Sequence, residues 1–167
     1  MRCFPVEARM SIWFKPITLD DARGSYEGAK DLAHHLGIEL TAVGADFLSG
    51  TMPVDERTRQ PFGLLHGGAS VALAETLGSV AANLCVDSTK VYCVGQEINA
   101  NHVRSARSGR VTGTARPIHL GSRSQVWEIR IEDEGGRLVC ISRLTMSVIE
   151  APGRGADQLV ASARAGR

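Results

Sequence analysis

One acidic residue stands in the middle of the most apolar stretch of the chain. The segment that begins at His66 reads HGGASVALAETLGS, and Glu75 is the only charged residue among the twenty from Gly67 to Val86. Burying a carboxylate is costly unless it is paired, protonated or needed for chemistry. We therefore expect Glu75 to be a buried catalytic carboxylate. The alternative is a structural carboxylate that backbone amides or an arginine satisfy.

The residues around Glu75 suit a ligand-binding face. If the segment is helical, Ser79 shares the face of Glu75 one turn later and Thr76 lies beside it. The short side chains of Ala72 and Ala82 on this face leave room for a ligand group next to the acid. The hydroxyl groups of Thr76 and Ser79 are therefore candidate companions of the carboxylate.

The HGG triplet at the start of this segment offers hydrogen-bond donors. Two glycines at a helix start let a ligand oxygen approach exposed backbone amides, and the helix dipole favours such an approach. His66 alone is weak evidence, because a histidine at a helix entry is often only a cap. Together with Gln60 and a nearby acid, these donors are the parts that acyl-transfer chemistry needs: an oxyanion site plus a base or nucleophile.

Positive charge gathers farther along the chain. No acidic residue occurs from Ile98 to Trp127, although the net charge of the whole chain is only +1. The segment contains five arginines and two histidines: Arg104, Arg107, Arg110, Arg116, Arg123, His102 and His119. One interpretation is a solvated strand face. The other is a site where arginines and the amides of the HLGSR turn hold a phosphate-bearing ligand.

Nucleotide folds and nucleic-acid binding fit this sequence less well. Aromatic residues, on which bases would stack, make up only 5% of the chain. No Walker loop or GxGxxG fingerprint is present. A net charge of +1 also gives no field over the whole surface for nucleic acid or an anionic membrane.

A central helix and an antiparallel sheet are expected to position these residues. Apolar residues cover nearly every side of the segment from about His66 to Cys85, which predicts a helix wrapped by a sheet. Strands are predicted at about 38–53 and in four runs after the helix, and strict alternation predicts a hairpin from 124 to 150. The polar stretch between 55 and 63 is a predicted loop. This pattern indicates an α+β fold.

Two short helices are expected before the first strand. Thr18 is placed as the N-cap of one, and Gly37 as the C-cap of the other. We expect one domain over 12–150, with a flexible extension at 1–11 and a flexible tail at 151–167. Met10 is an alternative start to Met1.

The cysteines and the start of the chain indicate a cytoplasmic protein. Cys3, Cys85, Cys93 and Cys140 have neither CxxC nor zinc-site spacing, so we expect reduced thiols and no bound metal. The first residues lack the apolar region of an export signal. The long apolar segment is too rich in polar and glycine residues for a membrane span.

Three motifs, in order, resemble the hotdog-fold acyl-CoA thioesterases that use a glutamate. The motifs are QPFGLLHGGASVALAETLGSVAAN, EINANHVRSAR and HLGSRSQVWEIRI, and the likeness covers about residues 12 to 149. The resemblance implies a hotdog fold, in which an antiparallel sheet wraps around one long central helix.

The resemblance also assigns roles by position. It makes Glu75 the nucleophile or general base, while Gln60, His66 and the Gly67 amide polarise the thioester carbonyl. Thr76 stands where relatives often carry serine, and Ser79 matches the family. A further set falls on positions that contact the CoA thioester: Gly95, His102, Val103, Arg104, Ser105, His119, Leu120, Gly121, Ser122, Arg123 and Ser124.

The implied activity is hydrolysis of an aromatic acyl-CoA, with 1,4-dihydroxy-2-naphthoyl-CoA of menaquinone biosynthesis as the first candidate substrate. A broad proofreading or phenylacetate-pathway thioesterase is the alternative within the class. A non-catalytic acyl-CoA-binding protein is an alternative of another class, although a binder needs no carboxylate beside the carbonyl. A hotdog dehydratase or hydratase fits the HGGxxxxLAE pattern less well.

The implied partners are the acyl-CoA substrate and further copies of the same chain. No cofactor, nucleic acid or membrane is expected. Family members pair two subunits so that Gln60 and His66 of one subunit meet Glu75 of the other, and two such dimers commonly form a tetramer.

Overall fold

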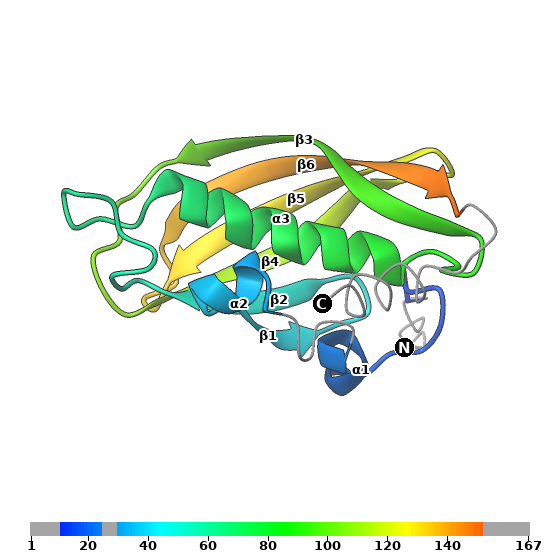
Figure 1. The fold of residues 1–167 in the computed structure, drawn as a ribbon, viewed down its shortest axis with the longest axis horizontal. Coiled ribbons are helices and arrows are strands. Elements are labelled where there is room, and N and C mark those ends of the chain that lie inside the picture. The colour runs from blue at the N-terminus through cyan, green and yellow to red at the C-terminus, as the bar shows by residue number, and fades with distance from the viewer. Residues whose placement is uncertain (1–10, 25–29, 152–167) are drawn as a thin grey trace, which may run out of the picture.

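A long helix lies against a curved antiparallel sheet in the computed structural model, which describes residues 11–24 and 30–151 (Figure 1). The helix, α3, spans Gly67–Leu84. Within the described residues the sheet has six strands in the order β1-β2-β4-β5-β6-β3. Their bounds are β1 Glu39–Val43, β2 Leu48–Pro53, β3 Val91–His102, β4 Arg110–Leu120, β5 Ser124–Asp133 and β6 Leu138–Glu150. The predicted α+β hotdog arrangement is confirmed.

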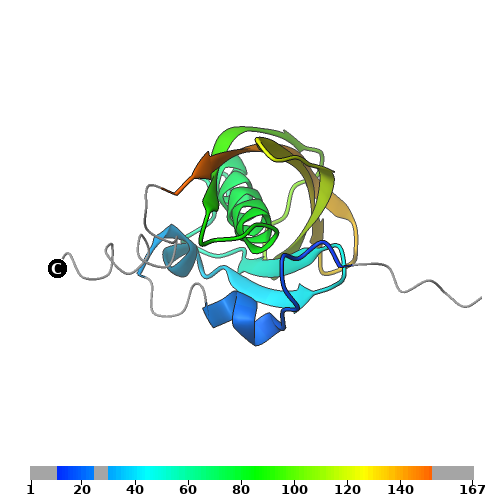
Figure 2. The same ribbon diagram turned by 90° about the vertical axis from the view of Figure 1, so that its right-hand side faces the viewer.

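The sheet curls around α3, as the end-on view shows (Figure 2). All five strand pairs are antiparallel, and the 124–150 hairpin predicted from alternation is the β5–β6 pair, in which Trp127 lies opposite Leu144. The edges of the sheet are β1 and β3. Both edges therefore flank the side of α3 that the sheet leaves open.

Glycines let α3 approach the sheet closely. The Leu77 side chain lies over Gly50 of β2 and Gly113 of β4, where a Cβ atom would come within 2.8 Å and 2.6 Å of it. Gly78 of the helix faces Leu144 of β6 in the same way, with 2.5 Å left for an added Cβ. Leu73, Leu77, Ile129, Ile131 and Leu144 are fully buried as a result.

Two short helices lie on the open side of the sheet: α1 (Leu19–Gly24) and α2 (Leu32–Leu36). Thr18 caps α1 as predicted, because its hydroxyl accepts the Asp21 amide while the Asp21 carboxylate accepts the Thr18 amide. Gly37 ends α2 in the left-handed conformation, with φ of 67°. Contacts tie α1 to β1 and α2 to α3.

The domain was predicted to span residues 12–150. The extension at 1–11 and the tail at 151–167 lie almost wholly outside the described residues, as does Cys3. Cys85, Cys93 and Cys140 are free thiols, and the last two are buried. In the described part of the chain, no helix is long and apolar enough to cross a membrane.

Candidate active site

Glu75 lies at the open side of α3, where its carboxylate contacts Gly95 of the edge strand β3. The prediction that Glu75 is buried was wrong for the single chain, because its side chain is only partly buried. The physical reason is that one stripe of the helix faces away from the sheet. This stripe contains Val71, Ala72, Glu75, Thr76, Ser79 and Asn83, all of intermediate exposure.

Two polar contacts hold β3 and β6 beside this stripe. The Ser79 hydroxyl lies 3.8 Å from the sulfur of Met146, which pairs with Gly95 across the sheet. One turn later, the Asn83 side chain forms two hydrogen bonds with the backbone of β3, as a neighbouring strand would. Its Nδ2 donates to the Cys93 carbonyl at 3.0 Å, and its Oδ1 accepts the Cys93 amide at 2.8 Å.

Asn83 therefore fixes the distance between the helix and the strand that carries Gly95. Its Nδ2 also donates to the Ser79 carbonyl at 2.9 Å, so the side chain is anchored at both ends. Asn83 was not among the predicted site residues. The signal was available, since an asparagine two turns after Glu75 is the other strongly polar side chain of an apolar helix.

The start of α3 presents two histidines around a glycine. His66 is the N-cap, and its Nδ1 accepts the Gly68 amide at 2.8 Å. As the first helical residue, Gly67 has an amide without an acceptor inside the helix. The ring of His102, from the end of β3, lies against Gly67, with Nε2 only 2.8 Å from the place of an added Cβ. An anionic oxygen could thus meet an amide and two imidazole rings here.

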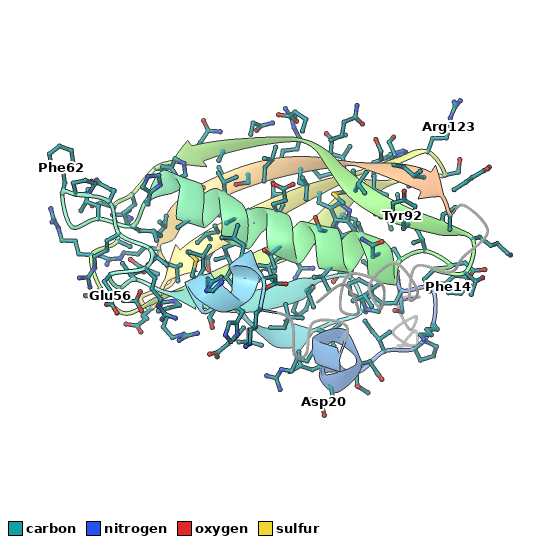
Figure 3. The ribbon with its side chains drawn as sticks, in the orientation of Figure 1. Phe14, Asp20, Glu56, Phe62, Tyr92 and Arg123 are labelled. Atoms are coloured by element: carbon teal, nitrogen blue, oxygen red, sulfur yellow. The ribbon has the colours of Figure 1, made fainter. Side chains whose placement is uncertain are left out.

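Gln60 belongs to an ordered loop just before α3. Its Oε1 accepts the Phe62 amide at 2.7 Å, and its backbone amide donates to Leu64 at 2.8 Å. Because Oε1 is engaged by a backbone amide, Nε2 is the atom left to donate to a ligand. Phe62 lies at the tip of this loop. It is 83% exposed and points away from the rest of the chain (Figure 3).

The helix start and Glu75 are well separated within one chain. Nine positions along α3 divide His66 from Glu75, which corresponds to about 13 Å at ~1.5 Å per residue. One thioester carbonyl cannot contact both groups of the same subunit. The chain therefore brings Glu75 together with Gly95 and Ser79, and the Gly67 amide together with His66 and His102, as two half-sites.

The stretches predicted to contact CoA also divide into two groups. His102–Ser105 begins at the last residue of β3, at one end of the sheet, whereas His119–Ser124 runs from the end of β4 to the start of β5 at the other (Figure 1). Arg123 marks that second end, far from Phe62 (Figure 3). The intervening β4 spans about 33 Å at ~3.3 Å per residue. Within one subunit these stretches do not form a single site.

Only part of the predicted basic stretch is free to bind an anion. Arg116 pairs with Asp46 at 2.7 Å, and Arg110 lies 3.4 Å from Glu39. These two arginines therefore balance an acid of β1 and an acid of the β1–β2 turn. Within the described residues, Arg104, Arg107 and Arg123 form no ion pair and are exposed.

The chemistry available is that of a carboxylate and amide donors. Across residues 11–24 and 30–151, no group of three or more histidine, cysteine or acidic side chains is placed to hold a metal ion. A carboxylate with a small, open neighbour can attack a carbonyl or take a proton from water, and amides at a helix start can stabilise the oxyanion that forms.

Comparison with known proteins points in the same direction. The family described as "Thioesterase superfamily" matches residues 62–140. The chain is 56% identical over 138 residues to the 1,4-dihydroxy-2-naphthoyl-CoA hydrolase of Escherichia coli, covering 83% of this chain and 99% of that protein. It is 52% identical to a proofreading thioesterase of Cronobacter turicensis, covering 83% of this chain and 98% of that protein.

A solved structure shares the fold over nearly the same length. A mutant thioesterase from Pseudomonas aeruginosa is 50% identical, with a TM-score of 0.80, and the match covers 84% of this chain and all of that one.

Proposed function

Because the chain belongs to the thioesterase superfamily, we propose that it hydrolyses the thioester of an aromatic acyl-CoA, with 1,4-dihydroxy-2-naphthoyl-CoA as substrate. The observation that carries this proposal is the contact between the Glu75 carboxylate and Gly95, on a helix stripe that the sheet leaves open. The relative from Escherichia coli named for that substrate supports the choice of acyl group. A role in menaquinone biosynthesis, in the cytoplasm, follows from this choice.

Glu75 supplies the reactive carboxylate in the proposed reaction. It either attacks the thioester carbonyl directly or takes a proton from the water that attacks it. In both cases the carbonyl oxygen gains negative charge, and the thiolate of CoA leaves. After direct attack, water then hydrolyses the anhydride between the acyl group and Glu75, which frees the acid and restores the carboxylate. The Gly67 amide and Gln60 Nε2 donate to that oxygen, and the positive end of α3 favours it. No cofactor is needed for these steps.

The complete site requires two subunits. Since one carbonyl cannot reach the two half-sites of a single chain, His66, Gly67 and Gln60 of one subunit act with Glu75 of another. The free edge of β3 is suited to pairing with its own copy around a two-fold axis. The same axis brings the His102–Ser105 stretch of one subunit towards the His119–Ser124 stretch of the other. Two such dimers form a tetramer in this proposal.

The test is release of free thiol from a panel of aryl- and alkyl-CoA esters by wild type and Glu75→Gln. An amide nearly matches the shape of the carboxylate but is neither a base nor a nucleophile. We expect Glu75→Gln to retain its fold and its binding of CoA while turnover falls by several powers of ten. Turnover within about tenfold of wild type would remove Glu75 from the chemistry.

A non-catalytic acyl-CoA-binding protein is the candidate of a different class. It would bind the same esters but release no thiol in the wild type. The partly exposed carboxylate of Glu75 favours the enzyme, because a binder gains nothing from a carboxylate next to the carbonyl.

A further inference from the structure

The loop that leads into α3 is fixed to the sheet through one buried side chain. Among residues 55–66 only Thr58 is buried, with 1% of its surface exposed. Gln60 is partly exposed and His66 is exposed, although both belong to the half-site at the start of α3. We infer that Thr58 is a positioning residue, which holds this half-site in the place that the thioester carbonyl requires. The inference rests on the proposed function and adds a residue to it.

The Thr58 hydroxyl ties the loop to the end of β2. It donates to the carbonyl of Pro53, the last residue of that strand, at 2.7 Å. It also accepts the Asp55 amide at 3.1 Å, which closes the turn at 55–58. A hydroxyl can donate once and also accept, and here it is engaged in both ways. The side chain therefore sets the position of Thr58 relative to the sheet.

The backbone of Thr58 extends this attachment to the helix start. Its carbonyl accepts the amide of His66, the N-cap of α3, at 2.8 Å. A bridge between Arg59 and Leu65 pairs the two sides of the loop next to this hydrogen bond. The Leu65 amide adds a contact with the Ala106 carbonyl at 2.8 Å. Of these attachments, the one through Thr58 joins β2 directly to the N-cap.

Gln60 depends on the same base of the loop. Its amide donates to the Leu64 carbonyl at 2.8 Å, and the Gly63 amide donates to the Gln60 carbonyl at 2.9 Å. These bonds give the tip of the loop its own shape, so that its place is decided at the base. Donors to an oxyanion act in the transition state, and a misplacement of about 1 Å can cost about 100-fold in rate. A loop released from β2 should therefore lose catalysis before it loses substrate binding.

The experiment compares Thr58→Val with Thr58→Ser in the full-length protein. Valine keeps the shape of the side chain but lacks the hydroxyl, whereas serine keeps the hydroxyl and lacks a buried methyl group. We expect Thr58→Val to lower kcat for the best ester by about tenfold or more, while KM stays within about threefold. Thr58→Ser should keep kcat within about threefold, even though the lost methyl group lowers its urea unfolding midpoint.

Thr114→Val is the matched control, since it removes a threonine hydroxyl at a distance from this loop. That hydroxyl lies 2.9 Å from the hydroxyl of the buried Ser49, between β4 and β2. The unfolding midpoint should fall in this variant, but kcat should stay within about threefold. A second readout combines Thr58→Val with Gln60→Ala. Because Thr58 acts through this half-site, its loss should cost clearly less than tenfold once the Gln60 amide group is gone.

The variants separate a positioning role from a purely structural one. Wild-type kcat in a folded Thr58→Val, or a kcat that merely follows the unfolding midpoint in all three variants, would overturn the inference. Should Thr58→Val not fold, Thr58→Ala takes its place, because it differs from Thr58→Ser by the hydroxyl alone and the same difference in kcat is expected. If wild type releases thiol from none of the esters, the proposed function fails and the inference falls with it. That outcome is distinct from an active wild type with an equally active Thr58→Val.

Discussion

The carboxylate of Glu75 lies directly against the α-carbon of Gly95, so that a Cβ atom at residue 95 would overlap Oε1. Glycine at this point of β3 is therefore a requirement of the site and not of the strand. The sheet needs no glycine there for its backbone, because Gly95 does not have a positive φ.

Gly95→Ala should displace the carboxylate and lower kcat by about 100-fold, as expected when a reacting group shifts by roughly 1 Å. The measurement is steady-state hydrolysis of the best ester, with the oligomer mass checked because β3 is an edge strand. Gly24→Ala is the matched control, since nothing lies within 4 Å of a Cβ added there. A Gly95→Ala enzyme with wild-type kcat would show that the carboxylate works from another position.

Asn83→Leu should destabilise the protein by about 1–3 kcal/mol, because it leaves the buried amide and carbonyl of Cys93 without partners. The measurement is the urea unfolding midpoint at fixed protein concentration. Asn101→Ala removes an exposed amide from the same strand and should change the midpoint little. Equal midpoints for the two variants would contradict the view that Asn83 fastens β3 to α3.

The exposed arginines should serve binding and not the chemical step. Changing Arg104 and Arg123 together to alanine is expected to raise KM for the CoA ester about tenfold or more while kcat stays within about threefold. Increasing salt should raise the wild-type KM in the same direction. Arg116→Ala is the control, because Asp46 already occupies that guanidinium. An unchanged KM and no response to salt would make these arginines a solvated surface.

The internal thiols should react slowly with alkylating reagents at neutral pH. Burial raises the pKa of Cys85 from 9.0 to about 12, with a smaller effect of Cys93, and burial raises the pKa of Cys93 to about 11. Because only the thiolate reacts, modification of the native protein should stay slow at pH 8 and accelerate above about pH 10. Mass mapping of the peptides that contain Cys85 and Cys93 measures this directly. Rapid labelling of either at pH 8 in the folded protein would contradict it.

The same shifts predict how stability depends on pH. The folded protein keeps these two protons to higher pH than the unfolded chain, whose thiols titrate near 9.0. The contribution is therefore fully present below about pH 9 and is lost as pH rises through the folded pKa values. Unfolding midpoints measured between pH 8 and pH 11 should fall with pH, and serine at both positions should weaken that dependence.

Local patterns in the sequence were enough to predict most of the fold. Apolar residues on nearly all sides of the 67–84 segment predicted a surrounding sheet. The alternation of polar and apolar residues around Trp127 predicted the β5–β6 hairpin. Burial of Glu75 could not be judged in the same way. Its exposure depends on which stripe of α3 the sheet leaves uncovered, and this is decided by the distant strands β1 and β3.

The sequence supplied candidate site residues but not their arrangement in space. Arg110 and Arg116 look in the sequence like members of one basic stretch, whereas strand pairing places them beside Glu39 and Asp46. The division of the CoA-contacting residues between two ends of β4 has the same origin. Sequence proximity does not report the length of a strand in space, and the resemblance that supplied these residues did not say which of them share a subunit.

Complementation between two inactive variants tests the division of the site between subunits. His66→Ala removes the helix cap, which is one imidazole of the half-site at Gly67, and Glu75→Ala removes the carboxylate. Each variant alone should be inactive or nearly so. When the two are mixed under conditions that exchange subunits, half of the dimers are mixed, and each contains one site with both wild-type residues. Activity should then return to about a quarter of the wild-type value, as a two-fold arrangement requires.

The control for complementation is a mixture that cannot rebuild a site. Glu75→Ala mixed with Glu75→Gln lacks the carboxylate in every subunit, so exchange should restore nothing. Subunit exchange itself is followed by native mass, using one variant labelled with heavy isotopes. If mixed dimers of His66→Ala and Glu75→Ala form and no activity returns, both residues act within one chain. That result would require α3 to change shape during catalysis, because about 13 Å of helix separates His66 from Glu75 in the folded chain.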